Sequence, residues 1–429
     1  MRILLTANAS YLPPRGGATR SNLVWLQLLA RSGHACRIVA AALTRDPQAK
    51  LEQLRQEEIP VETLRSENGV ETAEYRGIRI WAAPDPAGRR RLLEEQIRAF
   101  QPDWVLVSSE DLGQLLLREA SRHAPGRVIY LAHTPQLFPF GPASWNPDPH
   151  STELVRRAAA IVVIGEHMAT YIETHLGRRP EVIHPPVYGQ EPFERYGRFD
   201  QGWITLINPC AVKGLPIFLE LARRFPQWPF AALPGWGTTA ADRRALEALP
   251  NVTLLANVRD IRLILARTRV LLMPSLWYEG FGLSVMEAML HGIPVLASDS
   301  GGLVEAKMGT RFVIPVRPIE QYEAAFDEHG LPRAVVPPQE IGPWEQALSA
   351  LLEDGDLYEA VAAESQAKAL EFVRRIRPEA LERFLLSLRP AATTPQDSET
   401  RRALAELSPE KRALLLARLR RKASREMSG

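Results

Sequence analysis

Two glutamates eight positions apart, Glu279 and Glu287, have the spacing that most clearly suggests chemistry. They flank a turn, EGFGLS, which follows the apolar run VLLMPS and precedes a predicted helix near 283–291. Glycines in the turn let a ligand approach the backbone, and amides at the amino end of a helix bind anions. The glycines are Gly280 and Gly282, and the amides are those of Phe281, Gly282 and Leu283.

A diphosphate fits such a turn, and the two carboxylates then lie on either side of it. Carboxylates accept paired hydrogen bonds from vicinal hydroxyls, so a sugar on one side and a ribose on the other form the natural ligand. A second turn at 300–302, SGG, followed by Glu305, strengthens this interpretation. The alternative is an ordinary strand, turn and amphipathic helix with solvated glutamates.

Three further positions have residue types suited to the same ligand. Gly16-Gly17 follows the first predicted strand and precedes the first helix, where free amides could bind an anion. Lys213 follows the first strand of the second half, from which an ammonium could reach a pyrophosphate, although a lone lysine is more often solvated. His133 ends the run RVIYLA, at the position of an active-site group, although an isolated histidine is usually structural.

The elements that must position these residues alternate along the chain. The apolar runs ILLTAN, RIVAAA, WVLVS, RVIYLA and IVVIG are separated by helical stretches, and WITLI, PFAALP, VTLLA, VLLMPS and IPVLAS repeat the pattern. Runs without polar alternation are expected where helices cover both faces of a parallel sheet. The fold class is therefore α/β, with two Rossmann-like domains facing each other across a cleft, and that cleft is the expected ligand site.

The domain boundaries follow from breaks in this pattern. We expect one domain over 1–190, a second over 200–375, and a C-terminal helix over 376–390. We also expect a small antiparallel insertion between Val61 and Ala82, with a turn at Asn68-Gly69. Residues 315–343 carry six prolines and predict an irregular insertion rather than regular structure.

Composition excludes several classes of protein. With 429 residues, 45% hydrophobic, 24% charged and a formal charge of +2, the chain is expected to fold as a globular protein that does not bind nucleic acid. Its opening residues do not resemble a secretory signal and no apolar run has the length of a transmembrane helix, so we expect a cytoplasmic location. Cys36 and Cys210 are expected to be buried and unpaired.

The last segment, 391–429, is predicted to be a linker followed by a basic amphipathic helix. Residues 401–425 carry nine Lys or Arg against Glu406 and Glu410, a local charge of +7. Leucines give this helix an apolar face that a partner helix, a subunit or an anionic membrane could accept. A solvated helix on its own domain explains the pattern equally well.

The chain resembles the retaining family-4 glycosyltransferases of GT-B fold, whose E-x7-E motif appears as Glu279 to Glu287. The resemblance extends over residues 1 to about 388 and includes PPRGGATRSNLVWLQLLARSGH, LAHTP around His133, and VKG at 212–214. It implies an acceptor domain over 1–190, a nucleotide-sugar donor domain over 200–375, and a helix over 376–390 that crosses back to the first domain. It also implies that Glu279 contacts the donor sugar and Glu287 the nucleotide ribose. The amides of 281–283 would bind sugar and phosphate, and His133 would contact the donor sugar.

One departure from the family pattern concerns the phosphate cations. Members commonly pair the lysine at position 213 with an arginine about five residues earlier, whereas this chain has Asn208 there. One cation is therefore missing or supplied from elsewhere. The D-x-D at Asp354 and Asp356 lies between predicted helices and is expected to be a helix cap, so no metal and no cofactor is expected.

The resemblance implies a retaining transfer of a sugar from a nucleoside diphosphate to an acceptor, with Glu279, Lys213 and His133 as the catalytic residues. A sugar-nucleotide epimerase of the same fold and a non-catalytic sugar-nucleotide-binding scaffold are the alternatives. The tail sequence LSPEKRALLLARLRRKA resembles the lead-in to condensation domains of nonribosomal peptide synthetases. This suggests a peptide or polyketide natural product as acceptor and an assembly-line protein as a possible partner.

Overall fold

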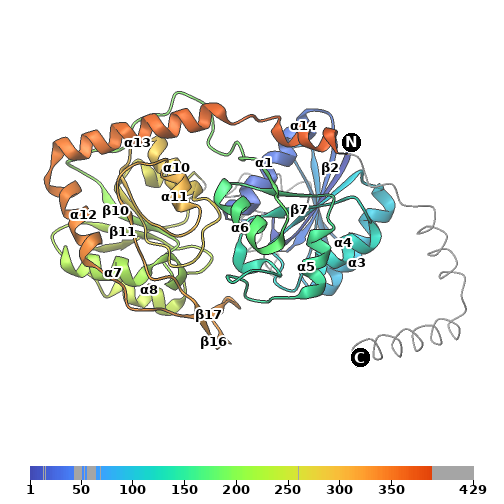
Figure 1. The fold of residues 1–429 in the computed structure, drawn as a ribbon, viewed down its shortest axis with the longest axis horizontal. Helices are drawn as coiled ribbons and strands as arrows, with labels where there is room; N and C mark the ends of the chain where they lie inside the picture. Colours follow the sequence, from blue (N-terminus) through green and yellow to red (C-terminus); the bar gives the residue numbers. More distant parts are fainter. Residues whose placement is uncertain are drawn as a thin grey trace, which may run out of the picture.

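The computed structural model describes residues 1–12, 14, 16–42, 51–52, 54–55, 64–67, 69–258 and 260–388. These residues form two α/β lobes side by side, each built on its own sheet (Figure 1). The predicted tail at 391–429 lies outside the described residues. Among the residues described, no helix has the length and apolarity needed to cross a membrane.

The first lobe contains a nine-stranded sheet in the order β3-β4-β5-β2-β1-β6-β7-β8-β9. From β5 to β9 neighbouring strands are parallel, with registers such as Ile3 opposite Cys36, whereas β3, β4 and β5 pair antiparallel, which confirms the predicted insertion. The strands are β1 (Arg2–Ser10), β2 (Ala35–Ala41), β3 (Arg65–Glu67), β4 (Val70–Tyr75), β5 (Ile78–Ala83), β6 (Trp104–Ser108), β7 (Val128–Ala132), β8 (Ala160–Val163) and β9 (Glu181–Val182).

Helices cover both faces of this sheet, which is why its central strands are apolar throughout. All five residues of β6 and of β7 are buried. The helices of this lobe are α1 (Gly17–Arg31), α3 (Pro86–Phe100), α4 (Leu115–His123), α5 (Pro149–Arg156) and α6 (Glu166–Leu176), with a short 3-10 turn, η2 (Pro135–Leu137).

The second lobe contains a six-stranded parallel sheet in the order β12-β11-β10-β13-β14-β15. Its strands are β10 (Trp203–Ile207), β11 (Phe230–Leu233), β12 (Val252–Leu254), β13 (Thr268–Met273), β14 (Val295–Ser298) and β15 (Val313–Ile314). Its helices are η3 (Ala211–Lys213), α7 (Leu215–Arg224), α8 (Ala240–Glu247), α9 (Arg262–Leu265), α10 (Leu283–Leu290) and α11 (Leu303–Ala306).

Two predictions about local structure meet different outcomes. Residues 315–343 are not wholly irregular, because β16 (Gln321–Phe326) and β17 (Pro332–Val335) pair as an antiparallel ribbon. A two-stranded ribbon has a free edge on each strand, so it tolerates the proline that argued against regular structure. Cys36 and Cys210 are both free and buried, as predicted.

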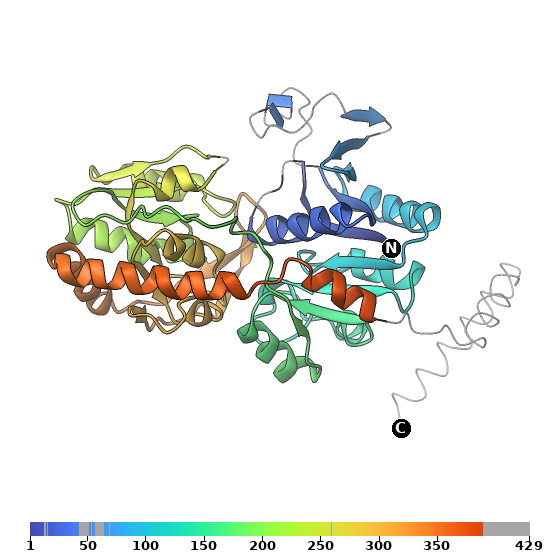
Figure 2. The ribbon, with the colours of Figure 1, turned by 90° about the horizontal axis from the view of Figure 1, so that it is seen from above.

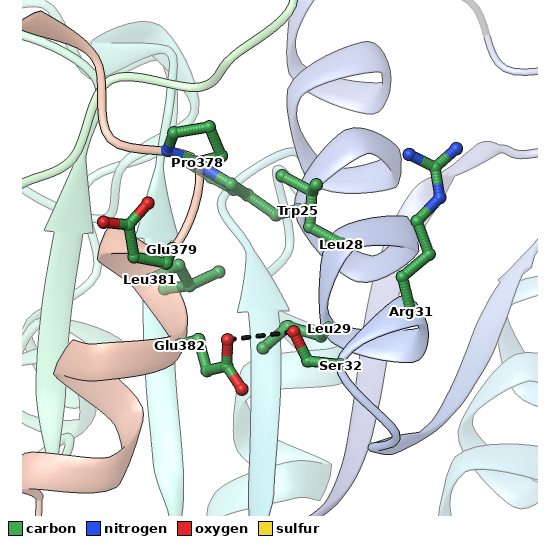
Figure 3. A pocket seen from close by; sticks show the side chains of 9 residues that line it. All are labelled: Trp25, Leu28, Leu29, Arg31, Ser32, Pro378, Glu379, Leu381 and Glu382. Atoms are coloured by element: carbon green, nitrogen blue, oxygen red, sulfur yellow. Dashed lines mark hydrogen bonds between the residues drawn. The ribbon is translucent and has the colours of Figure 1, made fainter.

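The last described helix returns to the first lobe. Helices α12 (Gly342–Glu353) and α13 (Gly355–Arg375) belong to the second lobe, and α14 (Ala380–Ser387) lies against the first (Figure 2). The side chain of Glu382 accepts hydrogen bonds from Ser32 at 3.0 Å and pairs with His34 at 2.8 Å. Trp25, Leu29 and Leu381 line a cavity of 240 Å³ between α1 and α14 (Figure 3).

Candidate active site

The candidate site lies where the carboxyl ends of both parallel sheets meet, the usual position for ligands in open α/β sheets. The contact is close: a Cβ atom added to Gly17, at the start of α1, would lie 3.2 Å from the side chain of Leu283, at the start of α10. The amino ends of two helices from different lobes therefore face each other. Their free amides make this junction suited to an anion.

Glu279, which follows β13, receives three hydrogen bonds on a single oxygen. Its Oε1 atom accepts from the Ser275 hydroxyl at 2.5 Å, from Trp277 Nε1 at 2.9 Å and from Lys213 Nζ at 2.5 Å. The residue is 9% exposed. Since these bonds fix the carboxylate through Oε1, the second oxygen, Oε2, is the atom that a ligand hydroxyl can reach.

Lys213 reaches this carboxylate from the 3-10 turn after β10. The following residue, Gly214, has φ +79°, and a Cβ atom there would lie 1.9 Å from the carbonyl oxygen of Pro274. Only glycine permits this approach, which brings η3 against the loop that carries Glu279. The Lys213 ammonium also lies 4.6 Å from the centre of the Trp277 ring, a cation–π contact.

The glycines of the predicted phosphate turn are required by contacts with other segments. Gly282 has φ +113° and is the N-cap of α10, and a Cβ atom at Gly280 would lie 2.3 Å from the backbone oxygen of His133. Gly301 has φ +57° and packs against the backbone of Glu279. The side chain of Phe281 is buried and packs on Phe372, so only its backbone faces the turn.

Glu287 lies in the second turn of α10 and is 7% exposed. Its Oε1 atom accepts a hydrogen bond at 2.7 Å from Arg20 Nη2, which comes from the first turns of α1 in the other lobe. The Glu287 charge raises the pKa of Arg20 above its usual value. Both glutamates of the motif are therefore paired with a cation, Glu279 with Lys213 and Glu287 with Arg20.

The Gly16-Gly17 pair forms the start of α1, as its position in the sequence predicted. Gly16 is the N-cap with φ +88°, and a Cβ atom there would meet none of the described residues within 4 Å. The positive φ, rather than crowding by these residues, is the reason for glycine at this position.

His133 follows β7 and is 4% exposed. Its Nε2 atom is hydrogen-bonded at 2.8 Å to Asn22 Oδ1, whereas Nδ1 is buried and has no hydrogen-bond partner within the described part of the chain. Burial lowers the pKa of the ring to about 4, so His133 is neutral near pH 7. The ring therefore cannot serve as a positive charge for a phosphate.

Asn208, which stands where the family has an arginine, is buried at the end of β10 with φ +58°. Its Oδ1 atom accepts from the backbone N–H of Gly237 at 3.0 Å, and its Nδ2 group has no partner among the residues that the structure describes. A neutral amide donor is thus available at this position. It can bind a phosphate or sugar oxygen, but it cannot neutralise charge.

Four residues of this site were not anticipated: Arg20, Asn22, Ser275 and Trp277. Ser275 and Trp277 lie within four positions of Glu279, so proximity in sequence offered a signal. Arg20 and Asn22 lie three and five residues after Gly17, in the first two turns of α1. Their partners, Glu287 and His133, are 267 and 111 residues away, and no local pattern predicts those contacts.

Two arrangements of acidic side chains in the described residues could be considered as metal ligands. Asp354 caps α13, accepting from the backbone N–H of Leu357 at 2.9 Å, which is the capping role predicted for the D-x-D. One group of three side chains is close enough to share an ion, Glu94, Glu119 and His123, on α3 and α4. Glu119 is already hydrogen-bonded to His123 at 2.8 Å and to Arg90 at 3.1 Å. We therefore interpret this group as an ion-pair cluster.

Comparisons with known proteins agree with this fold. The family model described as Glycosyltransferase Family 4 matches residues 15–188, and the one described as Glycosyl transferases group 1 matches residues 208–354. No curated protein sequence matches the chain. The chain belongs to the family-4 glycosyltransferases of GT-B fold, and the matched ranges contain Gly16, Gly17, His133, Asn208, Lys213 and the segment from Glu279 to Glu287.

Solved structures show the same fold over most of the chain. The chain is similar to sucrose-phosphate synthase of Thermosynechococcus elongatus, with a TM-score of 0.63, 14% identity, and coverage of 90% of this chain and 99% of that one. It is similar to Anabaena HepE in complex with UDP-glucose, with a TM-score of 0.61, 15% identity, and coverage of 90% and 98%. It is also similar to a TarM variant of S. aureus, with a TM-score of 0.62, 10% identity, and coverage of 90% and 99%.

Proposed function

We propose that this glycosyltransferase moves a sugar from a nucleoside diphosphate to an acceptor with retention of anomeric configuration. The observation that carries the proposal is the junction of α1 and α10, where two helix amino ends face each other between the pairs Glu279–Lys213 and Glu287–Arg20. Helix amino ends hold the diphosphate, Glu279 binds the sugar, and Glu287 binds the ribose diol.

The reaction proceeds without a covalent enzyme intermediate in this proposal. The acceptor oxygen forms a bond to the anomeric carbon on the face from which the phosphate departs, and the bond between that carbon and the phosphate oxygen breaks. The acceptor proton passes to the departing phosphate oxygen. Lys213 stabilises the charge on the leaving nucleotide, so catalysis rests on positioning and electrostatics. Closure of the two lobes excludes water and limits hydrolysis.

No cofactor and no metal takes part in this proposal. Among the residues that the structure describes, the cations near the proposed diphosphate site are Lys213 and Arg20, and the remaining donors are the amides of the two helix amino ends. Asn208 contributes a neutral amide N–H in place of the family's arginine.

The donor nucleotide is the first unknown to test. HepE is described in complex with UDP-glucose, and the TarM structure contains UDP, so UDP-sugars are the first donors to examine. Thermal shift against UDP-, GDP-, ADP- and dTDP-sugars identifies binders, since a ligand that binds only the folded state stabilises it by mass action. Transfer is then measured with the best binder and an acceptor panel, and the anomeric configuration of the product is determined by NMR.

The same assay separates the proposed transfer from its alternatives. Conversion of the donor sugar to its epimer without acceptor would identify an epimerase, and tight binding with no turnover on any acceptor would identify a binding scaffold. Glu279→Gln is the control variant, because it preserves the shape of the side chain and abolishes its charge. A product with inverted configuration would contradict the retaining mechanism.

The acceptor proposal, a peptide or polyketide natural product bound to an assembly-line protein, rests on the tail sequence alone. Removal of residues 395–429 is expected to leave transfer to a small free acceptor unchanged and to impair transfer to a carrier-bound one. Equal activity of the truncated and full-length proteins on both acceptors would contradict this role. A lowered thermal midpoint of the truncated protein would show instead that the tail is structural.

A further inference from the structure

Asn22 connects the ends of three neighbouring strands beneath the candidate site. It lies on the buried face of α1 and is fully buried. Its Nδ2 group donates to Tyr11 Oη at 3.0 Å, next to the end of β1, and to Ser108 Oγ at 3.1 Å, at the end of β6. Its Oδ1 atom meets Nε2 of His133, after β7, at 2.8 Å.

The direction of each proton in this network follows from its chemistry. Ser108 donates its hydroxyl proton to Glu110 Oε2 at 3.1 Å, so its lone pairs are free to accept from the Asn22 amide. Both amide protons of Asn22 are then used on oxygen atoms, and its Oδ1 atom is the acceptor that remains. The Nε2 atom of His133 must therefore carry the proton of that hydrogen bond.

A neutral imidazole with its proton on Nε2 has a bare lone pair on Nδ1. That atom is buried and has no hydrogen-bond partner in the described part of the protein. Trp25 lies beside the ring, with the centroids 6.2 Å apart. Its indole Nε1–H is also buried without a hydrogen-bond partner among the described residues, so it does not donate to Nδ1. A buried acceptor without a donor is costly, so this lone pair is the feature of His133 that a ligand satisfies.

The backbone of His133 relates this residue to the sugar site. Its carbonyl oxygen lies against Gly280, where an added Cβ atom would come within 2.3 Å of it. Gly280 directly follows Glu279, the residue proposed to bind the sugar. A hydroxyl group bound between them can donate to Nδ1 while Glu279 accepts from a neighbouring hydroxyl.

We propose that Asn22 is a positioning residue, which holds His133 in its Nε2–H tautomer so that Nδ1 accepts a hydrogen bond from a hydroxyl of the transferred sugar. This rests on the proposed function for the identity of the ligand, whereas the tautomer is a property of the protein alone. Asn22 itself does not touch the substrate. Ser108, with Glu110 behind it, orients the Asn22 amide.

The tautomer is measured on the ligand-free, full-length protein labelled with 15N-histidine. Two-bond 15N–1H correlations distinguish Nε2–H from Nδ1–H, and the His133 signals are assigned by their loss in His133→Gln. The expected result is a neutral Nε2–H ring from pH 5 to pH 8. Asn22→Ala is expected to give a mixture of tautomers. An Nδ1–H ring in the unaltered protein, or no change in Asn22→Ala, would overturn the proposal.

Two further variants separate positioning from a merely structural role. Asn22→Asp keeps an acceptor for Nε2–H, but its charge favours the protonated ring, so the ring is expected to titrate within pH 5–8. Ser21→Ala is the matched control, because Ser21 is the preceding residue, is also fully buried, and uses its hydroxyl on the Gly17 carbonyl at 2.9 Å rather than on His133. In Ser21→Ala, the His133 ring is expected to have the same tautomer as in the unaltered protein.

Kinetics with the donor that the unaltered protein turns over completes the test. Asn22→Ala is expected to lower kcat/KM about ten- to a hundredfold, as for loss of one preorganised partner, whereas Ser21→Ala stays within about twofold. Asn22→Asp is expected to recover activity only above the pH at which the His133 ring of this variant loses its proton. Equal losses in Asn22→Ala and Ser21→Ala, with equal drops in thermal midpoint, would contradict the proposal. If no donor is turned over, the proposed function fails, while the NMR result still decides the tautomer.

Discussion

Arg20 and Glu287 form an ion pair at 2.7 Å between the two lobes, and this pair occupies the carboxylate that we assign to the nucleotide ribose. The Arg20 side chain is 40% exposed, whereas that of Glu287 is 9% exposed. A ribose that binds Glu287 through Oε1 must displace the guanidinium, whereas one that binds through Oε2 leaves the pair in place. Because Arg20 extends from the helix end that faces the proposed diphosphate turn, its cation is close to the anion in either case. We therefore propose that Arg20 supplies the charge that the family resemblance implies for an arginine at position 208.

This relationship predicts the sign of the effect of Arg20→Ala on nucleotide binding. Loss of a nearby positive charge is expected to weaken the affinity for a nucleoside diphosphate about tenfold at low salt, and less at high salt. Calorimetry measures it, and Arg31→Ala, in the last turn of the same helix, is the control. Tighter binding in Arg20→Ala would show that Arg20 only competes with the ribose.

The sequence predicted the fold because the central strands of both sheets are parallel and covered on both faces. Strands such as Val105–Val107 and Leu271–Met273 are buried on each side, which produces apolar runs that cannot be confused with surface strands. The ribbon at β16 and β17 was missed because none of its residues is fully buried: Phe326 is 64% exposed and Val335 is 45% exposed, and Tyr322 and Ala334 are only partly buried. Such a partly covered ribbon has no apolar run in its sequence.

The candidate site was predictable where its residues share one turn and not where the lobes meet. Glu279, Gly280 and Gly282 belong to one strand-to-helix connection, so their spacing contained the information. The partners of Glu287 and His133 depend on how α1 packs against the second lobe and against β7. That packing is set by the whole interface, which no short window of sequence describes.

A second prediction separates the roles of the two motif glutamates. Glu287→Ala is expected to weaken binding of the bare nucleoside diphosphate about ten- to a hundredfold, the effect of losing one charge-assisted hydrogen bond. Glu279→Ala is expected to leave that affinity nearly unchanged, because it contacts the sugar and its loss frees Lys213 for the phosphate. Transfer falls in both variants. Equal loss of nucleotide affinity would refute this division.

A third prediction concerns Lys213, which is held between Glu279 and the Trp277 ring. Lys213→Ala is expected to lower turnover by about 10²-fold, as for removal of one preorganised electrostatic partner. Turnover is measured at saturating donor, so that weaker binding does not contribute. Lys368→Ala, which changes a half-exposed lysine on α13, is the control. Near-normal turnover of Lys213→Ala would assign charge neutralisation to Arg20 alone.

A fourth prediction is that transfer survives a chelator, since helix amino ends and two cations are sufficient to hold the diphosphate in the proposed mechanism. Asp354→Ala is expected to lower the free energy of unfolding by about 1 kcal/mol, the usual cost of losing an N-cap, with turnover unchanged. Activity that chelation abolishes and magnesium restores would contradict the prediction. It would also return Asp354 and the cluster around Glu119 to consideration as metal ligands.

The last prediction concerns Lys307, a fully buried lysine whose ammonium donates to the backbone oxygen of Val295 at 2.6 Å. Burial lowers its pKa to about 7, although the charge of Glu364 acts in the opposite direction. Between this value and the ordinary lysine pKa of about 10.4, the unfolded chain binds one proton more than the folded chain. Stability contributed by this residue therefore rises with pH across that window and is constant below it.

The difference in unfolding free energy between the unaltered protein and Lys307→Met is expected to shift in favour of the unaltered protein from pH 7 to pH 10, by up to about 1.4 kcal/mol per pH unit. Urea unfolding of both proteins at pH 6, 8 and 10 measures the shift, with Lys368→Met as the exposed control. A difference that does not change with pH would mean that Lys307 keeps an ordinary pKa in the folded protein.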